Sequence, residues 1–259
     1  MSRIKIESGI QLLNRIKNPN CNVWNLEDKL FTEGLKANDI VAVMADSVYL
    51  KNMLLMHLLK QTILVDSFKN LSVGAHNRGV LFIDTAFQFN LDHFANYLRR
   101  CVDTDRTSLN VSDREVIVEK SLENLLYVPC YDSHQLSVTF YGLRSTISSN
   151  SNIRLLVLDN VGANYWQDLL NGGKRKMNYY EKNIIVTMQN YIKNFELPLL
   201  YVRPESFISK YPAACELCSY QIDAKKSEKN KFYYKVEAKS KLQKIEKIFI
   251  TSGAGLKWI

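Results

Sequence analysis

The chain has 259 residues, of which 46% are hydrophobic and 23% charged, with a formal net charge of +8. This length and apolar content are enough for one α/β domain with a large core. No stretch approaches the ~18 to 20 consecutive apolar residues that span a bilayer, and the amino terminus has no apolar run of a secretory signal. We therefore expect a soluble, intracellular protein without a membrane partner.

Five cysteines are scattered along the chain, and an odd, dispersed set is typical of reduced thiols rather than of a disulfide framework. Cys215 and Cys218 form a Cys-x-x-Cys pair, which is half of the ligand set of a structural zinc ion. No second pair exists, and no histidine is close in sequence. We interpret the two residues as ordinary thiols and expect no metal.

Short apolar runs rich in β-branched residues alternate with segments of helical period, which predicts βαβ units and a largely parallel sheet. Each run is almost entirely apolar, as in strands that are covered on both faces. The expected strands are Ile40 to Met44, Gly79 to Asp84, Leu125 to Val128, Arg154 to Leu158 and Pro198 to Val202.

Helices are expected between these strands, because apolar residues recur there every three to four positions. A capping box is predicted at Ser112 to Glu115 and opens one of them. A short amphipathic helix is expected near the amino terminus, with Ile10, Leu13 and Ile16 on one face. The longer helices are Leu50 to Gln61, Leu91 to Cys101, Asp132 to Ile147 and Asn178 to Phe195.

The carboxyl-terminal segment differs from the rest in composition. Phe232 to Tyr234 and Ile248 to Ile250 predict two late strands, an antiparallel hairpin at the sheet edge. Between Lys225 and Lys247 there are nine lysines and three glutamates, a local net charge of +6. This density is typical of a polyanion-binding surface, and equally of a solvated edge that lysines protect from aggregation.

Together these elements predict a single α/β domain over 1–259, a largely parallel twisted sheet with helices on both faces and a carboxyl-terminal antiparallel edge hairpin. Within it, residues 1–38 form an entry segment with the short helix, 39–210 the α/β core, and 211–259 the basic segment with the edge strands. We find no internal repeat and no linker of low complexity.

The loops after the strands are where such a sheet binds ligands. A phosphate-binding loop after the first strand needs glycines that let consecutive N–H groups turn inward, then Lys and Ser or Thr. Here Lys51 is present, but no glycine occurs between Gly34 and Gly74, and Val48 to Leu50 are bulky. After Leu158 comes Asp159, an acid at a strand end as in a Walker B motif.

Several motifs resemble the RecA-type recombinase family, and most closely its smallest eukaryotic paralogue, which lacks the amino-terminal domain of the family. The similarity covers nearly the whole chain and implies a RecA-like ATPase core. The motifs that carry it are Glu7-Ser8-Gly9 with Leu12-Leu13, Leu81 to Thr85 followed by Phe87 and Phe89, and Leu158-Asp159 leading to Tyr165-Trp166-Gln167-Asp168 and Asn171-Gly172-Gly173.

The departures from the family bear on its ATPase chemistry. The resemblance places vestigial counterparts of the nucleotide site at Ala45, Val48 and Leu50 for the glycines, Lys51 for the lysine, Asn52 for the magnesium ligand, Ala86 for the general base, Asp159 for Walker B and Glu205 for the sensor. Because hydrolysis needs positioning and charge stabilisation together, these losses predict a pseudo-ATPase without catalytic residues. Neither ATP nor magnesium is expected as a cofactor, although a helix terminus can still bind phosphate through backbone amides.

The resemblance also implies how such a chain acts. It maps one DNA-binding loop onto Asn171 to Lys176, with Lys174, Arg175 and Lys176 as phosphate contacts, and a second onto 206–231. Charge that keeps a helix-start loop soluble is the other interpretation of the first loop. The implied function is a nuclear, non-catalytic subunit that supports recombinase filaments on single-stranded DNA, partnered by the D-type recombinase paralogue and other paralogues. A stand-alone DNA-binding module and a DNA-stimulated ATPase with an atypical nucleotide loop are the alternatives.

The Tyr-Trp-x-Asp motif is expected to be structural. Tyr165 and Trp166 should pack against the core side of the preceding strand, and Asp168 should fix the following loop. Replacing a buried aromatic residue costs about 3 to 5 kcal/mol, so Trp166→Ala is expected to be insoluble.

Overall fold

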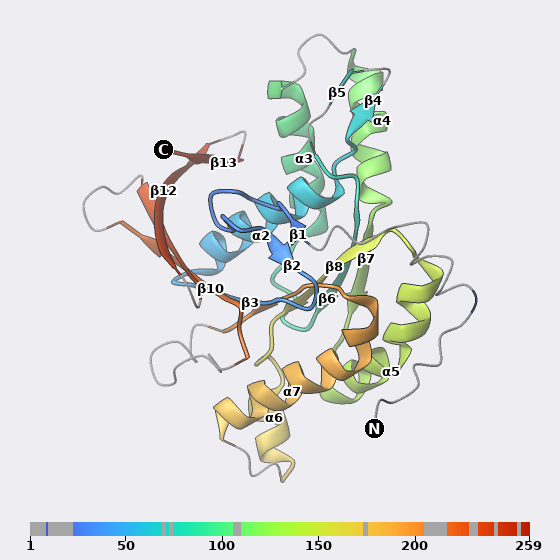
Figure 1. Cartoon of the computed structure of the whole chain (residues 1–259), viewed down its shortest axis with the longest axis vertical. Helices are drawn as coiled ribbons and strands as arrows, with labels where there is room; N and C mark the ends of the chain where they lie inside the picture. The colour runs from blue at the N-terminus through green and yellow to red at the C-terminus, as the bar shows by residue number, and fades with distance from the viewer. Residues whose placement is uncertain are drawn as a thin grey trace.

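The computed structural model (Figure 1) describes residues 9, 23–68, 71–72, 75–105, 110–172, 176–204, 217–227, 233–240, 243–252 and 255–259. The short helix predicted around Ile10, Leu13 and Ile16 lies outside these ranges. The division into 1–38, 39–210 and 211–259 stays a prediction.

A nine-stranded sheet organises the molecule, in the order β13-β12-β11-β10-β3-β9-β8-β6-β7. From β10 to β7 all neighbours are parallel, which confirms the predicted α/β class. The bounds of these six strands are β10 Tyr220–Lys226, β3 Ile40–Ala45, β9 Leu199–Val202, β8 Ile153–Asp159, β6 Gly79–Asp84 and β7 Leu125–Pro129. Two small sheets pair β1 Val23–Trp24 with β2 Leu35–Lys36, and β4 Ser67–Phe68 with β5 Leu71–Ser72.

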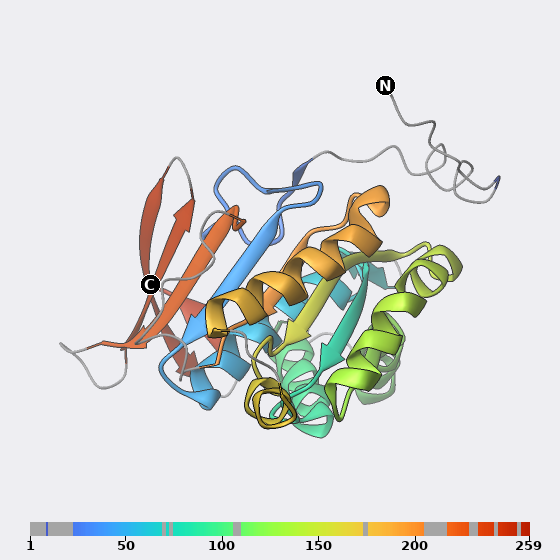
Figure 2. The ribbon, with the colours of Figure 1, turned by 90° about the horizontal axis from the view of Figure 1, so that it is seen from below.

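Helices cover both faces of this sheet (Figure 2). Both faces are apolar, because successive residues of each strand point to opposite sides and both sets are hydrophobic. Val41 and Val43 belong to one apolar core, whereas Ile40 and Ala42 belong to the other. The first core contains α2 Val48–Ile63, α3 Leu91–Asp105 and α4 Val111–Leu122, and the second contains α5 Ser133–Ser149 and α7 Met177–Ile192. The short α6 Tyr165–Leu170 precedes α7, and the 3-10 turn η1 Lys193–Phe195 follows it. None of the helices in the described ranges is long and apolar enough to cross a membrane.

The carboxyl-terminal strands extend the sheet further than the predicted hairpin. β11 Tyr233–Ser240 and β12 Lys244–Ser252 form that hairpin, and β13 Gly255–Trp258 adds an outer strand. β10, which the sequence analysis did not predict, lies parallel to β3 and antiparallel to β11, so it joins the parallel core to the antiparallel edge. Figure 1 shows these strands, in orange and red, at one side of the molecule.

The outer strand β13 is fixed against the helix layer at one glycine. Gly255 has a φ of +110°, and an added Cβ would lie 2.4 Å from Cε2 of Tyr97 on α3. A side chain there would meet both a strained backbone and a buried ring. Glycine at this position therefore allows β13 to lie directly against α3.

The start of α4 differs from the prediction. The helix begins at Val111, and the side chain of its N-cap residue Asn110 accepts a hydrogen bond from the backbone N–H of Asp113 at 2.7 Å. The capping box predicted at Ser112 is therefore wrong by two residues. The four-residue pattern was present, but Asn110 is as good an N-cap as Ser112 and starts the helix earlier.

Candidate functional site: the vestigial nucleotide site

The carboxyl ends of β3, β6 and β8 meet at one edge of the sheet, where the vestigial residues were predicted. Lys51 Nζ donates a hydrogen bond to Asp159 Oδ2 at 2.6 Å and another to Gln88 Oε1 at 3.2 Å. The Lys51 and Asp159 side chains are 6% and 0% exposed. The lysine that would bind phosphate in an active site is therefore engaged in a buried ion pair.

The turn between β3 and α2 has only two residues, Asp46 and Ser47. Ser47 caps the helix by accepting a hydrogen bond from the Leu50 N–H at 3.3 Å, and Asp46 Oδ2 accepts one from the Lys226 N–H at 2.7 Å. Val48 to Leu50, the predicted equivalents of a flexible loop, are already helical. A phosphate cradle needs free, inward-turned N–H groups, whereas here the Leu50 N–H is capped by Ser47 and the Asp46 N–H donates to the Ala224 carbonyl oxygen. These residues do not fit a phosphate-cradling loop.

The predicted magnesium and general-base positions have other partners. Asn52 Nδ2 donates to the Gln88 carbonyl oxygen at 2.6 Å, and the Ala86 N–H donates to Asp84 Oδ1 at 3.0 Å. Asp84 also accepts a hydrogen bond from the Tyr127 hydroxyl at 2.7 Å. Burial raises the pKa of Tyr127, and this bond to Asp84 raises it further. The Asn52 side-chain N–H and the Ala86 backbone N–H are thus bonded within the protein, and alanine at position 86 has no side-chain group that could act as a base.

The buried carboxylate of Asp159 is imperfectly satisfied. Burial raises its pKa, whereas the charge and the hydrogen bond of Lys51 lower it, and Asp84 raises it again. Its second oxygen, Oδ1, and the Oδ1 atom of Asn52 are buried without a hydrogen-bond partner. Lys51 is therefore the main group that compensates the charge of Asp159.

The structure places the remaining predicted residues as follows. Ala45 ends β3 in the core, Leu50 is fully buried, and Val48 is 46% exposed at the start of α2. Lys176 is exposed immediately before α7, whereas Lys174, Arg175 and Glu205 lie outside the described residues. Sequence reasoning missed Gln88, which bonds both Lys51 and Asn52. Its only signal was a polar residue between Phe87 and Phe89 near a strand end.

The Tyr-Trp-x-Asp motif is structural only in part. Tyr165 is 7% exposed and packs edge-on against Tyr180, but Trp166 is 59% exposed. The predicted packing of Trp166 in the core is therefore wrong, since residues 165 and 166 point in different directions around a helix. Asp168 accepts hydrogen bonds from the hydroxyls of Ser133, at 2.5 Å, and Tyr180, at 2.6 Å, and so holds α6 between α5 and α7.

The base of the predicted second loop is built around another buried ion pair. Arg203, at the end of β9, donates to Glu181 Oε2 on α7 at 2.9 Å and 3.0 Å, and Tyr201 donates to Glu181 Oε1 at 2.9 Å. Cys218 is buried with its Sγ 3.3 Å from the Tyr201 hydroxyl, and Cys215 lies outside the described residues. The described part of the chain contains no cluster of three or more His, Cys, Asp or Glu residues suited to a metal ion.

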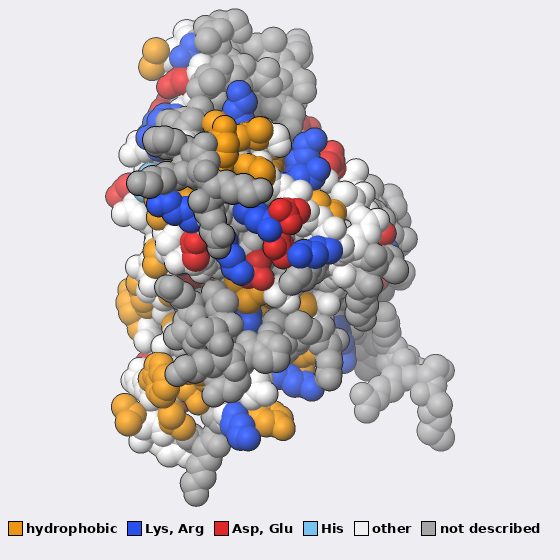
Figure 3. Space-filling view, turned by 90° about the vertical axis from the view of Figure 1, so that its left-hand side faces the viewer, with side chains coloured by type: hydrophobic (Ala, Val, Ile, Leu, Met, Phe, Trp, Pro, Cys, Tyr) orange, Lys and Arg blue, Asp and Glu red, His pale blue; other side chains and the backbone are white. Residues whose placement is uncertain are grey.

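The lysine-rich strands carry paired charges. Lys235 lies 3.0 Å from Glu237 and 2.9 Å from Glu246, and Lys244 lies 3.0 Å from Glu237. Figure 3 shows blue and red side chains interspersed on this side of the molecule. The positive charge of β11 and β12 is therefore partly neutralised by neighbouring strand residues.

The fold is similar to that in the crystal structure of the RadB recombinase, with a TM-score of 0.62 over 90% of this chain and 96% of that chain at 15% identity. In sequence, the chain is 28% identical over 172 residues to the DNA repair protein XRCC2 of Mus musculus. It is 21% identical over 243 residues to the DNA repair protein XRCC2 homolog of Arabidopsis thaliana. These similarities confirm the resemblance to RecA-type recombinases and to their XRCC2 members that the sequence motifs indicated.

The similarity has defined limits. The aligned regions cover 66% and 80% of this chain, but only 57% of the mouse protein and 64% of the Arabidopsis protein. No protein-family model matches the sequence. At 15% identity, the likeness to the RadB recombinase shows the fold alone.

Proposed function

We propose that this chain is a recombinase paralogue that acts in homologous recombination and DNA repair as a non-catalytic subunit. Its similarity to proteins named as DNA repair proteins and its RecA-like fold support the role in repair. The observation that supports the non-catalytic part is the buried ion pair between Lys51, in the first turn of α2, and Asp159, behind a two-residue turn that we propose cannot hold phosphate.

Nucleotide binding would have to break that pair. Moving Lys51 onto a phosphate would leave Asp159 charged, buried and unpaired, which is costly in a protein interior. Phosphoryl transfer depends on bound cations and on a positioned water molecule. Asn52 replaces the hydroxyl residue that binds magnesium, and Ala86 cannot act as the base that positions the water. We therefore propose a pseudo-ATPase that takes neither ATP nor magnesium as a cofactor.

A subunit without a nucleotide switch has to work through its partners. We propose that it docks, in the nucleus, on the D-type recombinase paralogue and further recombinase paralogues, and supports recombinase filaments on single-stranded DNA at breaks and stalled forks. The pairing of Lys235 and Lys244 with glutamates favours DNA contact within the complex over a stand-alone DNA-binding module.

The test is an ATPase assay of the purified chain with and without single-stranded DNA, beside an active RecA-type recombinase as the positive control. We expect no turnover above background and no change of melting temperature with ATP and magnesium, because a ligand that does not bind the native state cannot shift unfolding. Turnover above background that Lys51→Met abolishes, while the variant remains folded under the assay conditions, would show an active enzyme and contradict the proposal.

A further inference from the structure

Two aromatic rings stack on each other at the surface, at the carboxyl ends of the neighbouring strands β6 and β7. Phe87 follows β6 and Tyr131 follows β7, and their ring centroids lie 4.6 Å apart with an angle of 13° between the ring planes. Phe87 is 46% exposed and Tyr131 67% exposed. A ring in such a stack shields only one face of its partner, so aromatic surface remains open to solvent. Exposed apolar surface that adjoins other functional groups is typical of an interaction site.

The backbone under this stack is held in place by hydrogen bonds. Phe87 has a φ of +55°, which is unfavourable for a bulky side chain. Asp84 Oδ1 maintains this conformation by accepting hydrogen bonds from the N–H groups of Ala86, at 3.0 Å, and Phe87, at 2.8 Å. The Tyr131 N–H donates to Gln135 Oε1 at 2.9 Å. Strain that presents a ring to solvent is more typical of a binding site than of a packing requirement, and fixed rings lower the entropic cost of binding.

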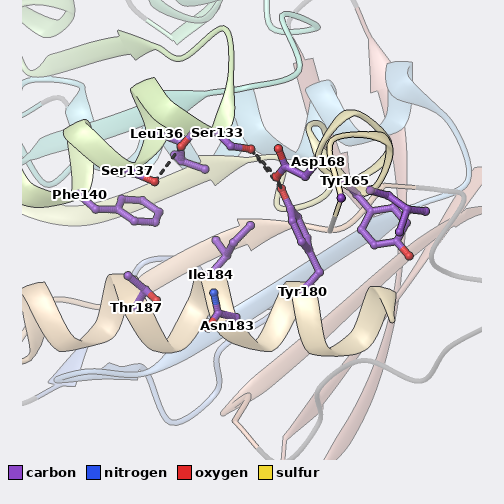
Figure 4. A pocket seen from close by; sticks show the side chains of 12 residues that line it. Ser133, Leu136, Ser137, Phe140, Tyr165, Asp168, Tyr180, Asn183, Ile184 and Thr187 are labelled. Carbon is purple, nitrogen blue, oxygen red and sulfur yellow. Dashed lines mark hydrogen bonds between the residues drawn. The ribbon is translucent and has the colours of Figure 1, made fainter. Parts of the chain in front are cut away.

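One carboxylate links the stack to the start of α7. Tyr131 lies two residues before Ser133, whose hydroxyl donates to Asp168 Oδ2 at 2.5 Å, and the Tyr180 hydroxyl donates to the same oxygen at 2.6 Å (Figure 4). The Tyr180 N–H in turn donates to the carbonyl oxygen of Lys176 at 3.0 Å, one helical turn earlier. Lys176 is exposed immediately before α7. The aromatic stack and an exposed cation are therefore brought to the same part of the molecule.

The chemistry of this surface suits a nucleobase. Sites for single-stranded nucleic acid combine aromatic rings, on which bases stack, with cations that contact phosphates, and every base has a flat face that can stack. A cationic side chain can also bind an aromatic face, but the exposed Lys176 and the net charge of +8 disfavour a basic ligand. The carboxylates of Asp84 and Asp168 accept hydrogen bonds from the protein itself, which reduces their repulsion of a phosphate.

We propose that Phe87 and Tyr131 form a stacking platform for an unpaired base of single-stranded DNA, outside both predicted DNA-binding loops. The base stacks on the open aromatic surface of the pair, and a phosphate further along the strand meets Lys176. The inference rests on the proposed function in DNA repair. It adds a contact that depends on the bases of the strand and not on its charge.

The experiment measures fluorescence anisotropy of the full chain assembled with the co-expressed D-type recombinase paralogue, and compares oligo-dT with an abasic strand of equal length. The abasic strand keeps the phosphates and lacks the bases, so the ratio of the two affinities isolates stacking. We expect Tyr131→Ala to lower the affinity for oligo-dT about fivefold or more, and to leave the abasic affinity and the salt dependence unchanged. Tyr131→Phe keeps the ring and should preserve the ratio. Tyr141→Ala, which removes another exposed tyrosine on α5, is the matched control.

A strand that carries iodouracil gives a second readout on the wild-type chain, which does not depend on how a variant folds. Iodouracil photo-crosslinks to an aromatic ring stacked on it, so we expect crosslinks to Tyr131 or Phe87. An unchanged affinity ratio in Tyr131→Ala, or the absence of these crosslinks, overturns the platform but not the role in repair. A complex that binds no single-stranded DNA overturns both the platform and the proposed DNA contact. Loss of assembly in a folded Tyr131→Ala variant shows that the ring anchors a protein partner and overturns the platform.

Discussion

At the scale of single residues, Lys51 is the clearest case of a side chain whose role depends on its surroundings. By sequence it is the surviving lysine of a phosphate loop, but in the fold it neutralises Asp159 in the interior. A lysine and an aspartate 108 positions apart thus form a contact that stabilises the core. In this fold Lys51 therefore contributes to the stability of the core.

Removing Lys51 should destabilise the protein. Lys51→Met keeps most of the side-chain volume but leaves the Asp159 carboxylate buried and unpaired, and breaking a buried pair costs about 3 to 5 kcal/mol. Because the pKa of Asp159 is already raised by burial, the carboxyl can take up a proton in acid, so the cost should shrink as pH falls. Urea denaturation at pH 7 and pH 5 measures both effects. Lys60→Met, on the same helix, is the control, and an equal loss there would contradict the assignment.

Trp166 should tolerate substitution, contrary to what the sequence alone predicted. Its side chain is 59% exposed, so Trp166→Ala is expected to change the free energy of unfolding by less than about 1 kcal/mol. Tyr165→Ala is the matched comparison, because Tyr165 is buried beside Tyr180 and should cost about 3 kcal/mol or more. Thermal unfolding of the two variants measures both costs. An insoluble Trp166→Ala variant would support the interpretation that Trp166 packs in the core.

At the scale of elements, the carboxyl-terminal strands show how lysine-rich sequence becomes a folded edge. Glu237 and Glu246 lie opposite each other on β11 and β12, a pairing of like charges that is unfavourable on its own. Lys235 bridges both glutamates and Lys244 bonds Glu237. Two of the lysines are therefore needed to stabilise the hairpin register.

Glu237 should titrate far below an ordinary glutamate. Its hydrogen bonds from Lys244 and Lys235 lower its pKa to about 2. A folded-state pKa below the unfolded value stabilises the fold at neutral pH, and this contribution is lost as pH falls from the ordinary range of about 4.5 through about 2. Lys244→Met should raise the pKa of Glu237, which carboxyl-detected NMR titration measures. Lys247→Met, on the same strand, provides the charge control, and an equal shift there would indicate a general field effect.

At the scale of the whole molecule, one sheet connects the vestigial site, the buried Arg203–Glu181 pair and the basic edge. β10 lies between the parallel core and the antiparallel strands, so the lysines of β10, β11 and β12 belong to the main sheet. Some of these lysines form ion pairs with glutamates of β11 and β12 that stabilise the sheet. This organisation supports the proposal that the chain contributes to a composite DNA-binding surface within a complex.

The isolated chain should therefore bind single-stranded DNA weakly and gain affinity within its complex. If Lys174, Arg175 and Lys176 contact phosphates there, affinity should fall with salt with a log-log slope of about 0.7 per contacted phosphate. Replacing all three by Gln should reduce both the slope and the affinity of the complex. Salt titrations of the free chain and of the complex measure this, and tight, salt-steep binding by the free chain would support the stand-alone module.

The parts of this protein that the sequence alone determined are those governed by local periodicity and residue type. Alternating apolar runs and helical stripes placed all the parallel strands except β10, because a doubly covered strand must be apolar on both faces. The absence of glycine around Val48 to Leu50 predicts that the turn before α2 is not an ordinary phosphate loop.

Only the tertiary structure decided what depends on residues far apart in the chain. The pairing of Lys51 with Asp159, the insertion of β10 beside β3, and the stacking of Phe87 on Tyr131 all join segments separated by tens of residues or more. Trp166 illustrates the same limit. It belongs to the same sequence motif as Tyr165, yet Tyr165 is buried and Trp166 is exposed. Local sequence sets which backbone forms, whereas the packing of distant elements decides which side chains are buried, paired or exposed.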